Sequence, residues 1–106
     1  SPYAGCAAHA PMAIVTAYHE DGCRFPQYAQ IDLAIAMENL WLAAQSVGLG
    51  GVWLGVAPEE DRMAMVEKIL PIEPGQGTFA IFPIGYTTEE KDPQDRFKLE
   101  RIHYIK

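Results

Sequence analysis

The sequence predicts a layered domain of helices and strands, of the α/β or α+β class. Three short apolar runs, at residues 12–18, 52–56 and 78–84, are rich in β-branched and aromatic residues, as buried strands are. Two longer stretches with helical spacing, at residues 31–47 and about 58–70, lie between them. A chain of 106 residues suits one such domain.

The first predicted elements are a loop of small residues at 2–10 and the strand at 12–18. A polar segment at residues 20–27 follows, in which Gly22 and Pro26 are turn signals. These residues connect the first strand to the first helix.

The predicted helix at residues 31–47 is apolar around most of its circumference and carries only two charges, Asp32 and Glu38. A surface helix has a polar half, so this helix must be enclosed by its own domain or by a second subunit. Because obligate dimer interfaces resemble a domain core cut in half, we expect it at a two-fold interface that buries Met37 or Trp41.

A glycine-rich turn, with Gly48, Gly50 and Gly51, ends this helix and leads into the strand at 52–56. Glycine permits positive φ and lets a ligand approach the main chain closely. A helix C-cap followed by a buried strand explains the same residues without a ligand, since helices very often end in glycine.

The second predicted helix begins at Pro58, which precedes three acidic residues, and ends before Pro71. In the strand at 78–84, Pro83 predicts an edge or terminal position. Residues 87–98 are charged and loop-like, and residues 102–105 can form an extended arm.

Composition excludes several classes of partner. The chain is 49% hydrophobic and 21% charged, with a formal net charge of −6 and a pI near 4.9. Binding to nucleic acid or an anionic membrane relies on clustered Lys and Arg, so neither is expected as a partner. No membrane segment is evident, because glycines interrupt the long uncharged run at 39–57. Two cysteines give no disulfide framework, which favours a cytoplasmic location.

Two separated motifs give a resemblance to a known family. The helix and turn fit D-x-x-x-A-x-x-N-L-x-L-A-A followed by G-L-G-x-x-W, and the tail fits I-G-Y, then P-x-x-R-F, then R-I-H-Y. The matching residues are Asp32, Ala36, Asn39, Leu40, Leu42, Ala43, Ala44, Gly48, Leu49, Gly50, Trp53, Ile84, Gly85, Tyr86, Pro93, Arg96, Phe97, Arg101, Ile102, His103 and Tyr104. Over about residues 10–106 the chain resembles the FMN-dependent nitroreductases.

The resemblance implies an α+β fold with a mixed sheet flanked by helices, and a homodimer that holds FMN at its interface. It also implies an oxidoreductase in which FMN takes hydride from NADH or NADPH and reduces a nitroaromatic, a quinone or a similar small acceptor. Relatives that dehalogenate or that fragment flavin keep the fold and change the reaction. In such an enzyme the cofactor performs the hydride chemistry, so no catalytic side chain is expected.

The resemblance also assigns the cofactor site. The main chain of Trp53, Leu54 and Gly55 is expected to face the flavin ring, with one N–H donating to N5. Arg96 is expected to bind the FMN phosphate, for which its planar guanidinium is suited. A plainer interpretation makes Arg96 a surface arginine paired with Asp92 or Asp95, a contact worth little.

One family feature is absent, an N-terminal R-x-S-x-R-like stretch that helps to hold the flavin. We therefore expect residues 1–106 to be the C-terminal part of a single nitroreductase-like domain, which requires the missing N-terminal segment and is inactive alone. The alternative is a non-catalytic fragment that binds flavin or supplies a dimer interface.

A different class of function is a small zinc module. Cys6-x2-His9 and His19-x3-Cys23 supply four ligands in spacings that zinc sites use. Against it, the predicted strand between the pairs would be about 23 Å long and would hold them apart. The principal prediction therefore includes no metal.

Overall fold

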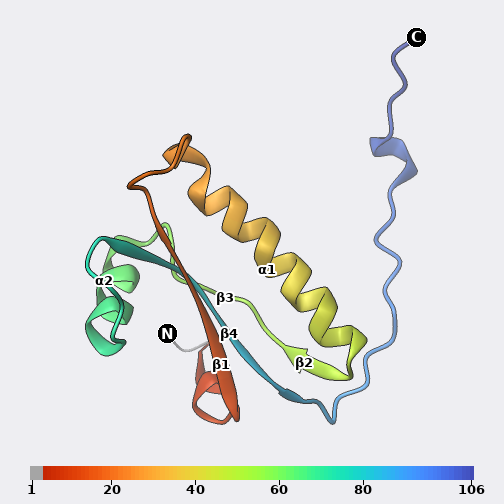
Figure 1. The fold of residues 1–106 in the computed structure, drawn as a ribbon. Helices are drawn as coiled ribbons and strands as arrows, with labels where there is room; N and C mark the ends of the chain where they lie inside the picture. Colours follow the sequence, from red (N-terminus) through yellow and green to blue (C-terminus); the bar gives the residue numbers. More distant parts are fainter. Residues whose placement is uncertain (1–3) are drawn as a thin grey trace.

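The computed structural model describes residues 4–106, so the first residues of the predicted N-terminal loop lie outside it. A short 3-10 turn, Gly5–Ala8, occupies the rest of that loop. The predicted order of strands and helices is confirmed (Figure 1). The strands are β1 (Met12–His19), β2 (Leu49–Gly51), β3 (Leu54–Gly55) and β4 (Gln76–Tyr86), and the helices are α1 (Ala29–Ser46) and α2 (Glu60–Ile69). Further 3-10 turns lie at Pro26–Tyr28 and Leu99–Arg101.

The sheet is built around β4, which pairs with β1 on one side and with both β2 and β3 on the other. All three pairings within the described residues are antiparallel, so this part of the chain forms an antiparallel sheet and not the mixed one expected. A β-bulge in β4 opposite Thr16 and Ala17 allows consecutive residues, Phe79 and Ala80, both to join the core.

The edge position predicted from Pro83 is wrong, because β4 is the central strand. The Pro83 carbonyl oxygen lies 2.7 Å from the position that a Cβ at Gly51 would take, so it faces β2. Since the nitrogen and oxygen of one strand residue face the same neighbour, the missing N–H is on that side as well. On that side Val52 and Trp53, which lie between β2 and β3, do not pair with β4. The missing N–H of Pro83 therefore costs little sheet hydrogen bonding.

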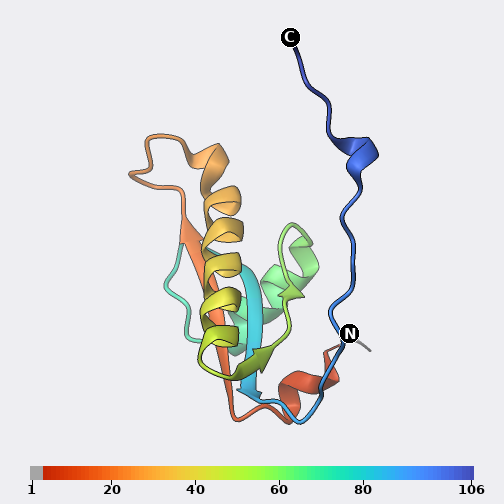
Figure 2. The same ribbon diagram turned by 90° about the vertical axis from the view of Figure 1, so that its right-hand side faces the viewer.

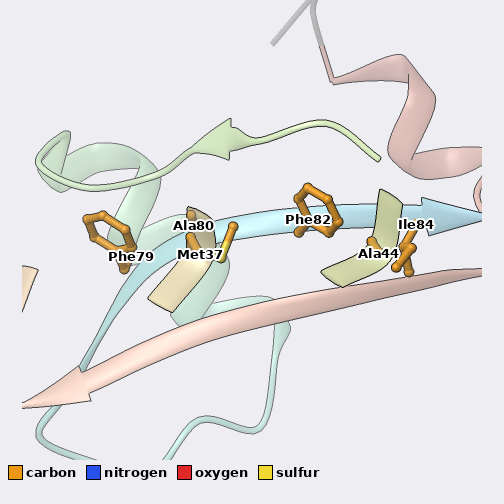
Figure 3. Close-up of a cluster of buried hydrophobic side chains, with 6 residues drawn as sticks. All are labelled: Met37, Ala44, Phe79, Ala80, Phe82 and Ile84. Atoms are coloured by element: carbon orange, nitrogen blue, oxygen red, sulfur yellow. The ribbon is translucent and has the colours of Figure 1, made fainter. Parts of the chain in front are cut away.

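Helix α1 covers one face of the sheet with a stripe of apolar side chains (Figure 3). Met37 and Ala44 are buried against Phe82 and Ile84 of β4. The Trp41 ring meets the Phe82 ring edge to face, with centroids 5.7 Å apart. The prediction that Met37 lies at a subunit interface is wrong, because its side chain is 0% exposed in the single chain.

The opposite face of α1 is apolar and uncovered. Ile31, Ile35 and Leu42 are 57%, 59% and 62% exposed. Thus the single chain encloses the helix on one side only, and cover of the other side by a second subunit stays a prediction.

The glycine-rich turn is shorter than predicted. Gly48, with φ of 78°, ends α1 in the left-handed region that glycine adopts at low cost. The next three residues pair with the end of β4 as β2, and the strand predicted at 52–56 is reduced to β3. Residues 49–51, which the sequence pattern assigned to the turn, therefore form a strand because they pair with β4.

Helix α2 begins at Glu60, two residues later than predicted. A fully buried threonine on β4 fastens it to the sheet. The Thr78 hydroxyl donates to the Met63 carbonyl at 3.3 Å, and the Thr78 N–H donates to Glu67 Oε1 at 3.2 Å. Both polar groups of Thr78 that face the helix are thus hydrogen-bonded, as burial requires.

Residues 87–106 form an arm that extends away from α1 and the sheet (Figures 1 and 2). Every residue of this C-terminal arm is exposed. It raises the radius of gyration to 16.7 Å, against about 13 Å for a compact chain of this length. Its large apolar side chains are exposed; they are Phe97, Leu99, Ile102, Tyr104 and Ile105.

Candidate functional site

The edge of β3 is the part of the predicted site that the fold organises. Leu54 lies opposite Ile81 of β4, and Gly55 lies opposite Ala80. The N–H of the next residue, Val56, donates to the Phe79 carbonyl at 3.1 Å. In an antiparallel pair alternate residues bond to the partner strand. The N–H groups of Leu54 and Val56 therefore face β4, and the N–H and the C=O of Gly55 face outward.

A side chain from α2 supports this orientation. Arg62 Nη1 donates to the Gly55 carbonyl at 3.4 Å, from the side away from β4. Because the N–H and the C=O of a strand residue share one edge, the Gly55 N–H is directed to the same outer edge. The Leu54 amide is thus directed to β4, whereas the Gly55 N–H is available to a ligand.

The space beside Gly55 is open. A Cβ built on Gly55 would meet no atom within 4 Å. The contrast with β2 is clear, since a Cβ on Gly51 would collide with the Phe82 ring and a Cβ on Gly50 would lie 3.1 Å from Thr87 Cβ. The glycines of β2 therefore allow the chain to pack against itself, and Gly55 leaves room for a ligand.

The tryptophan of the predicted site has a packing role. The Trp53 ring meets Phe79 edge to face, with centroids 5.6 Å apart, and its side chain is half-buried. This contact anchors β3 to the core and holds the Gly55 edge in place.

Arg96 is in a different part of the molecule. It lies on the C-terminal arm, is exposed, and donates through Nη2 to Gln94 Oε1 at 3.0 Å. Asp95, one of its expected partners, instead accepts the N–H of Phe97 at 3.0 Å. Within residues 4–106, Arg96 therefore forms no hydrogen bond with the edge of β3.

A hollow of about 840 Å³ lies where the C-terminal part of α1 meets β2 and the end of β4, and its lining extends to Val52. None of the four predicted site residues lines it. Its walls include Trp41, Gln45, Gly51, Gly85, Tyr86 and Lys91. The hollow is bounded by the start of the arm and opens widely to solvent, so its volume alone does not identify a site.

The zinc alternative is not supported. Within residues 4–106 there is no group of three or more His, Cys, Asp or Glu side chains placed to hold a metal. Cys6 and His9 precede β1 and His19 ends it, and eight strand residues span about 26 Å. At the far end, Cys23 donates to the His19 carbonyl at 3.2 Å. Both thiols are free and exposed.

Over the described part of the chain, no helix has the length and apolar character required to cross a bilayer.

Comparison with known proteins places this geometry in context. The sequence profile of the Nitroreductase family matches residues 3–86. A protein of Methanothermobacter thermautotrophicus named "Putative NADH dehydrogenase/NAD(P)H nitroreductase" is 36% identical over 105 residues, which are 99% of this chain and 55% of that protein. An Archaeoglobus fulgidus protein of the same name is 43% identical over 75 residues, or 68% of this chain and 43% of its own length. The chain spans about half the length of these curated relatives.

Solved structures of similar fold belong to proteins with related names. The crystal structure of "Putative NADH Oxidase" from Clostridium acetobutylicum superposes with a TM-score of 0.91 at 34% identity and covers 100% of this chain and 64% of its own. A nitroreductase from Bacteroides fragilis, solved with bound FMN, gives 0.67 at 22% identity over 95% of this chain and 54% of its own, which shows the shared fold.

Proposed function

The chain belongs to the nitroreductase family, and from this membership we propose that it forms part of an FMN-dependent oxidoreductase. In the proposed reaction NADH or NADPH is the hydride donor, and a nitroaromatic, a quinone or a similar small molecule is the acceptor. The observation that carries the proposal is the outward Gly55 edge, which combines a directed main-chain N–H with open space.

The residues fit a flavin ring in two respects. A flat ring lying on a strand edge requires a position without a side chain, and Gly55 is open where a Cβ would stand. A ring nitrogen that accepts hydride requires a fixed donor, and the Gly55 N–H is directed outward by the alternation of β3. When bound, FMN supplies the hydride chemistry, and the protein supplies orientation and electrostatics.

The role proposed for Leu54 is narrower than expected from sequence. Its amide faces β4, so it supports the edge and does not donate to the ring. Trp53 likewise supports the edge through Phe79. We therefore assign the contact with N5 to Gly55.

The phosphate of FMN requires cations that the body of the chain provides sparsely. Residues 4–86 contain nine Asp or Glu and three Lys or Arg. Residues 96–106 contain four Lys or Arg and one Glu. The proposed phosphate ligand, Arg96, belongs to this basic end of the arm, and its guanidinium can bind two phosphate oxygens at once. We expect the isolated chain, which spans about half the length of its curated relatives, to bind FMN weakly.

We propose that the assembly is a homodimer. The uncovered face of α1 and the apolar side chains of the arm are both exposed in the single chain. The terminal part of the arm is basic and the body is acidic, so the arm of one copy is complementary in charge and polarity to the body of a second copy. Burial of both surfaces by a second copy removes a large apolar area from water. Free, exposed thiols are consistent with the reducing cytoplasm as its location.

The decisive experiment is a titration of the ¹⁵N-labelled chain with FMN, followed by ¹H–¹⁵N NMR, which detects weak binding. The expected result is a saturable shift of the Gly55 amide together with the indole N–H of Trp53. Shifts confined to the hollow beside Trp41 would contradict the proposed site. The absorbance spectrum of the purified protein then reports whether flavin remains bound through purification.

A further inference from the structure

Arg62 contacts a main-chain carbonyl and not one of the acidic side chains that precede it in the sequence. It lies in the first turns of α2, next to Glu59, Glu60 and Asp61. Between residues 4 and 106 its guanidinium forms no ion pair within 4.0 Å with any acidic side chain, and the contact it makes is with the Gly55 carbonyl. A surface ion pair is worth little, so the nearby acids do not compel a pairing.

The carbonyl that Arg62 contacts belongs to the residue at the open edge. The N–H of the same peptide group, that of Val56, donates to the Phe79 carbonyl at 3.1 Å, and the next N–H, that of Ala57, donates to the same carbonyl at 2.9 Å. The following turn is closed by the Glu59 N–H, which donates to the Val56 carbonyl at 3.1 Å. The connection from β3 to α2 is thus held at Val56 by the sheet and at Gly55 by Arg62.

We propose that Arg62 is a positioning residue for the flavin edge. By donating to the Gly55 carbonyl it holds that strand residue in the orientation that presents its N–H to a ligand. It also places a fixed positive charge at an edge where a ring would gain electrons. This inference rests on the proposed function, because it assigns a partner to the residue that presents the ring contact.

The test compares wild type with Arg62→Ala, Arg62→Lys and Lys68→Ala in the FMN titration. Lys68 is an exposed cation in the last turn of α2, so its removal changes the net charge equally at the other end of the helix. We expect Arg62→Ala to raise the apparent Kd for FMN by about three- to tenfold, less than the loss of a direct charged hydrogen bond to the ligand, because the contact is long and acts through Gly55. Arg62→Lys should restore part of the affinity, and Lys68→Ala should leave it within about twofold.

A second readout needs no flavin. Loss of the hydrogen bond should move the carbonyl ¹³C resonance of Gly55 to lower frequency in Arg62→Ala and leave it unchanged in Lys68→Ala. A purely structural role would lower the Tm of Arg62→Ala and leave the Kd for FMN unchanged at temperatures where the chain is folded.

The outcomes separate the two proposals. If FMN shifts the Gly55 amide with the same Kd in wild type and Arg62→Ala, the role of Arg62 is overturned and the proposed site stands. If FMN shifts no resonance from Trp53 to Gly55 in wild type, both are overturned.

Discussion

Two glycines of this fold should respond in opposite ways to the same substitution. In Gly51→Ala the new methyl group would collide with the Phe82 ring and lie 2.7 Å from the Pro83 carbonyl oxygen. Phe82 is 0% exposed and Pro83 is in the central strand, so neither neighbour can move away cheaply. Overpacking of a well-packed core costs about 1–3 kcal/mol, and we expect a value near 2–3 kcal/mol here because backbone is involved.

Gly55→Ala is the matched control. The added Cβ meets nothing within 4 Å, and the φ of Gly55 is not positive. The substitution should therefore leave the free energy of unfolding unchanged or raise it by about 0.4–1 kcal/mol, because alanine restricts the unfolded chain. It should nevertheless weaken FMN binding, because the methyl group occupies the space proposed for the ring.

Urea denaturation monitored by circular dichroism measures both effects on the free energy of unfolding. A loss of about 2 kcal/mol corresponds to a fall in Tm of roughly 8–16 °C for a domain near this size. Equal stability of Gly51→Ala and wild type would refute the packing argument for β2. Unimpaired FMN binding by Gly55→Ala would refute the open-edge argument for β3.

Three further experiments test other parts of the molecule. Thr78→Val should cost about 1–3 kcal/mol of unfolding free energy in urea, because it removes the hydroxyl that binds α2, while Glu67→Gln, which keeps the acceptor oxygen, should cost less. Leu42→Arg on the uncovered face of α1 should dissociate the proposed dimer in light scattering without unfolding the chain, because the side chain is already 62% exposed; an unchanged mass would contradict the interface. Arg96→Ala should raise the Kd for FMN at least tenfold, whereas Lys98→Ala should change the Kd much less; equal effects would argue against a specific phosphate contact.

The elements themselves were predictable because their signals are local. The β-branched run of β1 and the apolar spacing of α1 specify a strand and a helix wherever they occur, and the observed bounds, Met12–His19 and Ala29–Ser46, differ from the predicted ones by at most two residues. The glycine at the end of α1 acts as a C-cap for the same local reason.

Pairing was not predictable from such signals. Pro83 indicated an edge strand because proline cannot donate to a neighbour, yet which neighbour faces its nitrogen depends on the interruption between β2 and β3. Met37 and Leu42 are both apolar residues of one helix, and only the packing of α1 on β4 decides that the first is buried in the core and the second is exposed.

In the candidate site, too, some features follow from the local sequence and others from the tertiary structure. The sequence by itself determined the family resemblance and the segment that carries Trp53, Leu54 and Gly55, because a motif is a property of consecutive residues. Only the tertiary structure distinguished these three residues, because the direction of an amide follows from the register against β4 and the space beside a glycine follows from distant side chains. The contact of Arg62 with Gly55 likewise depends on how α2 returns to β3, a relation between residues that no spacing in the chain encodes.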